Sequence, residues 1–270
     1  MPEQPHTGAG RFEGSRVLIT GASGAVGGAL ALALAEEGAR TALVGRRLGA
    51  LERVAVAAPA GGPQPVCYQA DVTSDRDIAR LGCELPADFG GLDILVHSAG
   101  AISIGAVECM DATALDAQYN VNLRAPYALT RMFLPLLKKS RGQVVFINSS
   151  MGIGAKAGLA HYAATKHGLK AVADGLREEV NGDGVRVLSV FLGRTAGEMQ
   201  RGVHASEGRT YRGDRLIQPR DVASVVLAAL ALDRTAEVTE IAIRPLAPPF
   251  AATAPAAGAD TDGKRVEGGR

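Results

Sequence analysis

Residues 17–28 read V-L-I-T-G-A-S-G-A-V-G-G, in which a short aliphatic run meets a glycine-rich turn and the start of a helical segment. Gly21, Gly24 and Gly27 stand three residues apart. Glycine is needed where the backbone turns tightly and where a phosphate must approach bare amides, and the N-terminus of a following helix favours the same negative charge. By itself the stretch also fits an ordinary strand-to-helix connection, so the rest of the chain must decide between the two.

Beyond this stretch the chain alternates short apolar runs with segments of helical periodicity. The predicted strands span 17–20, 41–44, 66–69, 94–97, 144–148, 185–191 and 240–243, and the predicted helices span 25–37, 48–57, 75–85, 112–139, 160–180 and 220–232. Apolar strands that alternate with helices are typical of a parallel sheet, because right-handed crossovers place helices on both faces. We expect a doubly wound α/β parallel sheet, a Rossmann fold, in one domain over residues 14–246. A glycine turn after the first strand of such a sheet favours a dinucleotide site.

The two ends of the chain differ from this central domain. Residues 1–13 and 247–270 are rich in Pro, Gly, Ala and charged residues without periodicity. We expect flexible tails there, because neither end can bury enough apolar surface to offset the entropy lost on ordering. The N-terminus lacks the apolar core of a signal peptide, and no apolar run reaches the roughly 18 residues of a membrane span. These features predict a cytoplasmic protein without a membrane partner.

Charge and cysteine content argue against several other functions. The chain has 29 basic and 28 acidic side chains and a net charge of +1, so no charge excess argues for a nucleic-acid partner. Cys67, Cys83 and Cys109 are widely spaced and lack a C-x-x-C pair. This cysteine pattern favours a reducing compartment and predicts no metal site.

The residues after the second strand bear on the choice of nicotinamide cofactor. NAD-specific sites usually place an acidic residue there to hold the ribose 2′-hydroxyl. This chain has Arg46 and Arg47 instead, and guanidinium groups suit a 2′-phosphate. We therefore expect NADP(H), with NAD(H) as the second option. The alternative is that both arginines are solvated charges at the start of the next helix.

Further positions at the same sheet edge complete the expected cofactor site. Asp71 and Val72 follow the third strand, where they would meet the adenine, although Asp71 could instead only introduce a turn. Ser98, Ala99 and Gly100 follow the fourth strand, where small residues leave room for a ribose. The expected residues of the glycine turn that bind the cofactor are Gly21, Ser23, Gly24, Ala25, Val26 and Gly27.

Tyr162 and Lys166 stand four residues apart in a predicted helix, so their side chains share one helical face. A tyrosine with its ordinary pKa near 10 is a poor base, and lowering that pKa by about three units needs about 4 kcal/mol. A cation about 4 Å away, at an effective dielectric constant of about 20, supplies this order of energy. Ser149, thirteen residues before the tyrosine at the end of an apolar run, could add a hydroxyl. The alternative is a surface tyrosine on an amphipathic helix.

Taken together, these motifs resemble the short-chain dehydrogenase/reductase (SDR) family in its single-domain form, over residues 14–245. The motifs that carry the resemblance are the glycine turn, Asp71-Val72, Ala99-Gly100, Ser149, Tyr162 and Lys166, in this order and spacing. The resemblance implies a catalytic tetrad of Asn122, Ser149, Tyr162 and Lys166. In the family, the asparagine holds a water that links the lysine to solvent, and the serine hydrogen-bonds the substrate oxygen. The tyrosine is the general acid/base, and the lysine lowers its pKa and binds the nicotinamide ribose. Asn120 and Ser150 are the rivals for the asparagine and serine roles.

The chain departs from the family pattern at three places. Ala25 stands where the family usually has the middle glycine of the turn, and Ser98 stands where it usually has asparagine. Leu192 replaces a proline, which loosens a turn expected near the nicotinamide. The candidates at the nicotinamide end are Gly193 and Thr195.

The resemblance implies an NADP(H)-dependent oxidoreductase that interconverts a carbonyl and a secondary alcohol on a small-molecule substrate. The alternatives are an isomerase, epimerase or dehydratase with retained cofactor, and a non-catalytic NADP(H)-binding regulator. Residues 194–218 lack periodicity, and we expect them to cover the substrate. Arg201, Arg209 and Arg212 in this segment could bind an acidic substrate or could only solvate the segment. The family also implies a homodimer or homotetramer.

Overall fold

The predicted apolar runs form one parallel sheet in the computed structural model, which describes residues 10–246. The sheet of this part of the chain has seven strands in the order β3-β2-β1-β4-β5-β6-β7, and every pairing is parallel. The strands are β1 (Arg16–Thr20), β2 (Arg40–Gly45), β3 (Val66–Gln69), β4 (Ile94–His97), β5 (Gln143–Ser149), β6 (Arg186–Leu192) and β7 (Glu240–Ile243). The chain winds outward from β1 to β3 and then from β4 to β7, which confirms the doubly wound prediction. The order reverses between β1 and β4, where a crevice opens at the carboxyl ends of the strands.

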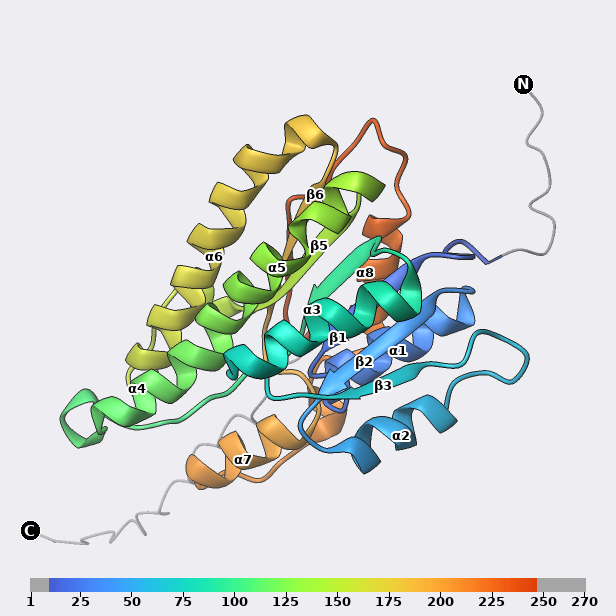
Figure 1. Cartoon of the computed structure of the whole chain (residues 1–270). Helices are drawn as coiled ribbons and strands as arrows, with labels where there is room; N and C mark the ends of the chain where they lie inside the picture. Colours follow the sequence, from blue (N-terminus) through green and yellow to red (C-terminus); the bar gives the residue numbers. More distant parts are fainter. Residues whose placement is uncertain (1–9, 247–270) are drawn as a thin grey trace, which may run out of the picture.

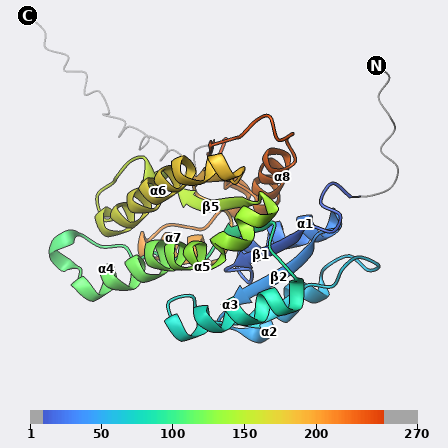
Figure 2. The same ribbon diagram turned by 45° about the horizontal axis from the view of Figure 1, so that its top comes forward.

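Helices cover both faces of the sheet (Figure 1). They are α1 (Ala25–Glu36), α2 (Leu48–Val56), α3 (Asp75–Phe89), α4 (Ala112–Tyr119), α5 (Ala125–Ser140), α6 (Ala160–Val180), α7 (Glu198–Ser206) and α8 (Pro219–Leu230). Figures 1 and 2 show α3, α5 and α6 over one face and α1 and α8 over the other. Alternate side chains of β1 pack on opposite faces of the sheet. Leu18 lies in the core under α3, α5 and α6, and Val17 and Ile19 lie in the core under α1 and α8. No helix in the described residues is long and apolar enough to cross a membrane.

The helix expected over residues 112–139 is interrupted, and this is a correction to the sequence analysis. A π-helical turn (Asn120–Arg124) separates α4 from α5, and the Ala125 amide donates to the carbonyl of Asn120, five residues back. The physical reason is Pro126 in the first turn of α5, which has no N–H to donate to the carbonyl of Asn122. The wider turn changes which side chains of this segment face the sheet edge.

A second difference is α7, which lies in the segment that showed no periodicity. This helix has nine residues and buries Val203 and His204. Two buried positions in so short a helix do not produce a repeating apolar pattern, so the sequence carries little signal for it.

The predicted tails lie mostly outside the described residues, which exclude 1–9 and 247–270. Residues 10–13 were assigned to the N-terminal tail, but the structure gives them a packed turn. Phe12 is 4% exposed and belongs to the same core as α1 and α8, and its amide donates to the Glu37 carbonyl at 3.0 Å. One aromatic side chain therefore ties this short segment to the sheet domain.

Candidate active site

A cleft of about 1390 Å³ runs along the carboxyl edge of the sheet. All the residues that we predicted to bind cofactor line it, and so do Ser149, Tyr162 and Lys166. They come from the segments after β1 to β6, because the carboxyl ends of parallel strands meet at one edge. Of the predicted site residues, Asn122 does not line the cleft, and its neighbour Asn120 does.

The glycine turn after β1 has the geometry of a phosphate-binding loop. Gly21 has a φ of +64°, and a Cβ there would lie 2.7 Å from the Ala99 backbone. A Cβ on Gly27 would lie 2.5 Å from the Gly21 carbonyl oxygen. The first turn of α1 has no side-chain cap, so its bare amides are available to an anion at the cleft. The loop therefore fits the pyrophosphate of a dinucleotide, even though Ala25 replaces the usual glycine.

The end of β2 presents positive charge to the cleft. Arg46 and Arg47 are both exposed, and neither has an ion pair with a residue in 10–246. Asp71 follows β3, the strand that pairs with β2. Its carboxylate accepts hydrogen bonds from the Thr73 amide at 2.9 Å and the Thr73 hydroxyl at 2.8 Å, so it also shapes its own turn. The Thr73 amide is the main cause of the lowered Asp71 pKa, and the charge of Arg46 contributes.

Tyr162, Ser149 and Lys166 all line this cleft. Tyr162 and Lys166 lie in the first two turns of α6 and are 8% and 4% exposed. Ser149 acts on the Tyr162 hydroxyl as a hydrogen-bonding neighbour that lowers its pKa, and the Ser149 Oγ also accepts from the Met151 amide at 3.2 Å. The Lys166 Nζ donates to the Ile147 carbonyl at 3.1 Å and lies 6.0 Å from the centre of the Tyr162 ring. A proton donor, a second hydroxyl and a buried amine are thus brought to one place.

Burial shifts the pKa values of Tyr162 and Lys166 in directions that the sequence did not predict. The pKa of Tyr162 is raised, because burial disfavours the phenolate, while the hydrogen bond with Ser149 acts in the opposite direction. Burial also lowers the pKa of Lys166 to about 8. In the protein alone the net shift of the Tyr162 pKa is therefore upward, because the loss of solvent outweighs the effect of Ser149.

Asn122 has a structural position rather than a place in the cleft. Its side chain is fully buried; Oδ1 accepts from the Ala101 amide at 2.8 Å, and Nδ2 donates to the Ala101 carbonyl at 2.9 Å. Nδ2 also donates to the Thr165 hydroxyl at 3.1 Å. Asn122 therefore joins the segment after β4 to the residue beside Lys166.

Two polar residues at strand ends position the site, and sequence reasoning missed both. The Thr20 hydroxyl accepts from the amides of Ser98 and Ala99 at 3.2 and 3.3 Å. The Asn148 side chain accepts from the Ser149 amide at 2.8 Å and donates to the Lys166 carbonyl at 3.1 Å. Each is a buried polar residue at the end of an apolar strand, and this was the available signal.

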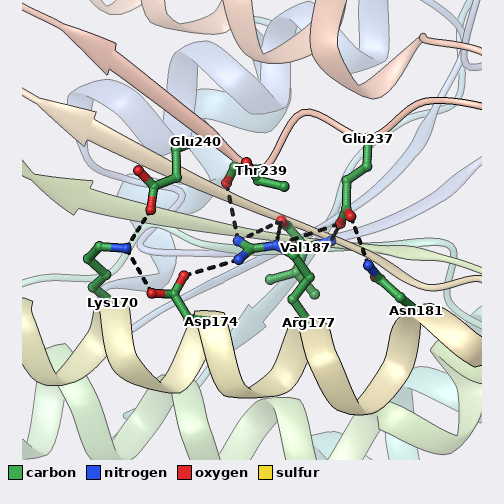
Figure 3. A network of polar contacts seen from close by, with 8 residues as sticks. All are labelled: Lys170, Asp174, Arg177, Asn181, Val187, Glu237, Thr239 and Glu240. Carbon is green, nitrogen blue, oxygen red and sulfur yellow. Dashed lines mark hydrogen bonds and ion pairs between the residues drawn. The ribbon is translucent and has the colours of Figure 1, made fainter.

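A polar network fixes the far half of the helix that carries Tyr162 (Figure 3). The guanidinium of Arg177 donates to the carbonyls of Val187 and Thr239, at 3.1 Å and 3.2 Å through Nη2. Lys170 pairs with Asp174 in the same helix and with Glu240 in β7. Because α6 is tied in this way to β6 and β7, the tyrosine and lysine at its other end are held on a rigid element.

The segment after β6 covers the other side of the cleft. Arg194 pairs with Glu207, and Arg201 pairs with Glu198 at 3.1 Å while lying 4.3 Å over the Tyr211 ring. The Tyr211 hydroxyl accepts from the Gly197 amide at 3.0 Å. Arg201 lines the cleft, whereas Arg209 and Arg212 pair with acidic residues outside it.

Comparisons with known proteins agree with this geometry. The family model described as short chain dehydrogenase matches residues 15–208. An uncharacterized oxidoreductase of Staphylococcus aureus is 30% identical over 230 residues, which are 85% of this chain and 96% of the relative. A glycine betaine reductase of Emericella nidulans is 32% identical over 87% of this chain, but the match spans 19% of that larger protein.

Solved structures of other proteins are similar to this chain in fold. A metagenomic short-chain oxidoreductase in complex with NADP is 30% identical, with a TM-score of 0.75 over 87% of this chain and 99% of that one. A short-chain dehydrogenase from Burkholderia cenocepacia, also in complex with NADP, is 30% identical, with a TM-score of 0.76 over 86% and 97% of the two chains.

Proposed function

Because this chain belongs to the short-chain dehydrogenase/reductase family and is an NAD(P)-dependent oxidoreductase, we propose that it interconverts a carbonyl and a secondary alcohol with NADP(H), with Tyr162 as general acid/base. The observation that carries the proposal is the meeting of Tyr162, Ser149 and Lys166 in the cleft that also contains the phosphate-binding turn. A bound nicotinamide supplies or accepts the hydride.

The side chains of the chain itself would move and hold the proton. In carbonyl reduction, Tyr162 donates its proton to the substrate oxygen, and the Ser149 hydroxyl hydrogen-bonds that oxygen. A tyrosine with a raised pKa stays protonated at neutral pH, which suits the acid role in this direction. In alcohol oxidation the tyrosine must first lose its proton, so this direction is expected to accelerate as the pH rises.

The preference for NADP(H) rests on charge. Arg46 and Arg47 line the cleft, and no acidic side chain follows β2 to hold a 2′-hydroxyl. A 2′-phosphate would gain charge-assisted hydrogen bonds from the guanidinium groups. Two homologous structures that contain NADP support the same preference. Ser149 is the proposed catalytic serine, because Ser149 rather than Ser150 is the serine that influences the Tyr162 pKa.

The test is a Tyr162→Phe variant, compared with wild type in a screen of NADPH oxidation across ketones and aldehydes. We expect turnover to fall by at least about a hundredfold, the scale of general acid catalysis, while the affinity for NADPH stays within about twofold. A variant with undiminished turnover would refute the role of Tyr162. Cofactor that stays bound without net NADPH consumption would instead favour an isomerase, epimerase or dehydratase. Binding without turnover of any kind would favour a regulator.

We extend the proposal to a homodimer or homotetramer. Four large apolar side chains are exposed along α4 and α5: Leu115, Tyr119, Tyr127 and Met132. Together they support an interface between two copies of the chain on these helices. A monomeric mass in solution would overturn this part of the proposal.

A further inference from the structure

More basic than acidic side chains line the cleft. Two of them are acidic, Asp71 and Glu198. The basic ones are Arg46, Arg47, Lys156, Lys166, Arg194 and Arg201. The proposed function already uses the two arginines after β2 and the lysine beside Tyr162. Three basic residues on the substrate side therefore remain to be explained.

Both arginines of this group have acidic partners. Arg194 forms its ion pair with Glu207, and both side chains are about a quarter exposed, at 24% and 22%. Arg201 pairs with Glu198 and stacks on an aromatic ring. Their charges are compensated within the protein, so neither needs an anion from a ligand.

Lys156 differs from them, because it has no ion pair with any residue in the described part of the chain although it lines the cleft. Its backbone is fixed. The Leu159 amide donates to the Lys156 carbonyl at 3.1 Å, Gly158 closes this turn with a φ of +76°, and the Gly105 amide donates to the Gly158 carbonyl at 3.0 Å. The turn leads directly into α6, whose third residue is Tyr162. An exposed lysine thus extends from a hydrogen-bonded turn that is close in sequence to Tyr162.

On the basis of the proposed function, we propose that Lys156 binds an anionic group of the substrate, so that the substrates are carbonyl compounds or alcohols that carry a carboxylate. The uncompensated charge of Lys156 attracts an anion on the substrate side of the cleft, and its ammonium can add a charge-assisted hydrogen bond. A neutral substrate of the same shape gains neither the electrostatic attraction nor the charge-assisted hydrogen bond. Because the lysine is exposed, solvent screens the attraction, and the effect on affinity is expected to be about two- to fivefold rather than larger.

The test compares two ligands that differ in charge but little in shape, 4-acetylbenzoate and its methyl ester. Calorimetry in the presence of NADP⁺ measures their binding without turnover, since a ketone cannot be oxidised further by this cofactor. Wild type is expected to bind the acid about two- to fivefold more tightly than the ester. Lys156→Met should abolish that difference, whereas Lys156→Arg should keep most of it. Lys139→Met, which removes an exposed lysine that does not line the cleft, should behave as wild type.

Three results would overturn the proposal: equal binding of acid and ester by wild type, binding of neither, or a preference that Lys156→Met retains. NADPH oxidation with the same ketones tests the proposed function separately. Turnover of acid and ester alike, without a preference for the acid, would support the oxidoreductase and overturn the role of Lys156. Preferred binding of the acid without NADPH oxidation would support Lys156 and count against the oxidoreductase.

Discussion

Replacing Lys166 by methionine should stabilise the folded, cofactor-free protein while it abolishes turnover. The lysine is 4% exposed, and within residues 10–246 its Nζ donates one hydrogen bond, to the Ile147 carbonyl. Burial lowers the Lys166 pKa from 10.5 to about 8. Each tenfold change in proton affinity is worth about 1.36 kcal/mol, so burial of the ammonium costs the folded state about 3 kcal/mol at pH 7.

Methionine removes this cost with a side chain of similar length. It leaves the Ile147 carbonyl without its donor from Lys166, which costs about 1 kcal/mol. We therefore expect Lys166→Met to be about 2 kcal/mol more stable than wild type at pH 7. Urea unfolding measures the difference, and NADPH oxidation measures the loss of turnover.

The pH dependence gives the sharper test. The folded-state pKa of Lys166, about 8, lies below the unfolded value of 10.5. Between these values the unfolded chain holds a proton that the folded protein has released, so wild type gains stability as the pH rises through this window. The variant has no such group. Its advantage should therefore fall from about 2 kcal/mol at pH 7 to about zero at pH 10.

Lys139→Met is the matched control, because that lysine is exposed and should change stability little at either pH. A Lys166→Met protein that is less stable than wild type at pH 7 would refute the reasoning. So would an advantage that is the same at pH 7 and pH 10, because a buried charge would then not be its cause.

Two further predictions concern the cofactor site and the start of the domain. Arg46→Gln should raise the KM for NADPH about tenfold, which corresponds to about 1.4 kcal/mol, and should change the KM for NADH less than about twofold. Equal changes for both cofactors would contradict a 2′-phosphate contact, and the exposed Arg220→Gln is the control. Phe12→Ala should lower the free energy of unfolding by about 3 kcal/mol in urea, because it empties a buried aromatic site. A loss below about 1 kcal/mol would instead agree with a domain that begins at residue 14.

Much of the fold could be predicted from local patterns. Strand runs such as residues 94–97 and the helix at 160–180 have the bounds expected from their apolar periodicity. The π-helical turn at Asn120–Arg124 was missed, although Pro126 carried a signal for it. The helix α7 was missed because its two buried residues form no repeat, and its position depends on contacts of Arg194, Arg201 and Tyr211 that join distant parts of the segment.

The candidate site was predictable in its residue types but not in its energetics. Ser149, Tyr162 and Lys166 could be selected from spacing, and they do meet in one cleft. The direction of the tyrosine pKa could not be predicted, because it depends on how completely α6 and the surrounding loops exclude water.

The sequence by itself determined the succession of strands and helices along the chain, the glycine turn at residues 17–28 and the residue types at the sheet edge. These depend on periodicity and on the φ that glycine allows, which are properties of neighbouring residues. The tertiary structure alone decided that Asn122 is buried while Asn120 faces the cleft, and that Lys156 lacks an acidic partner among the described residues. Burial and charge compensation depend on side chains that are distant in sequence and meet only when the sheet has formed.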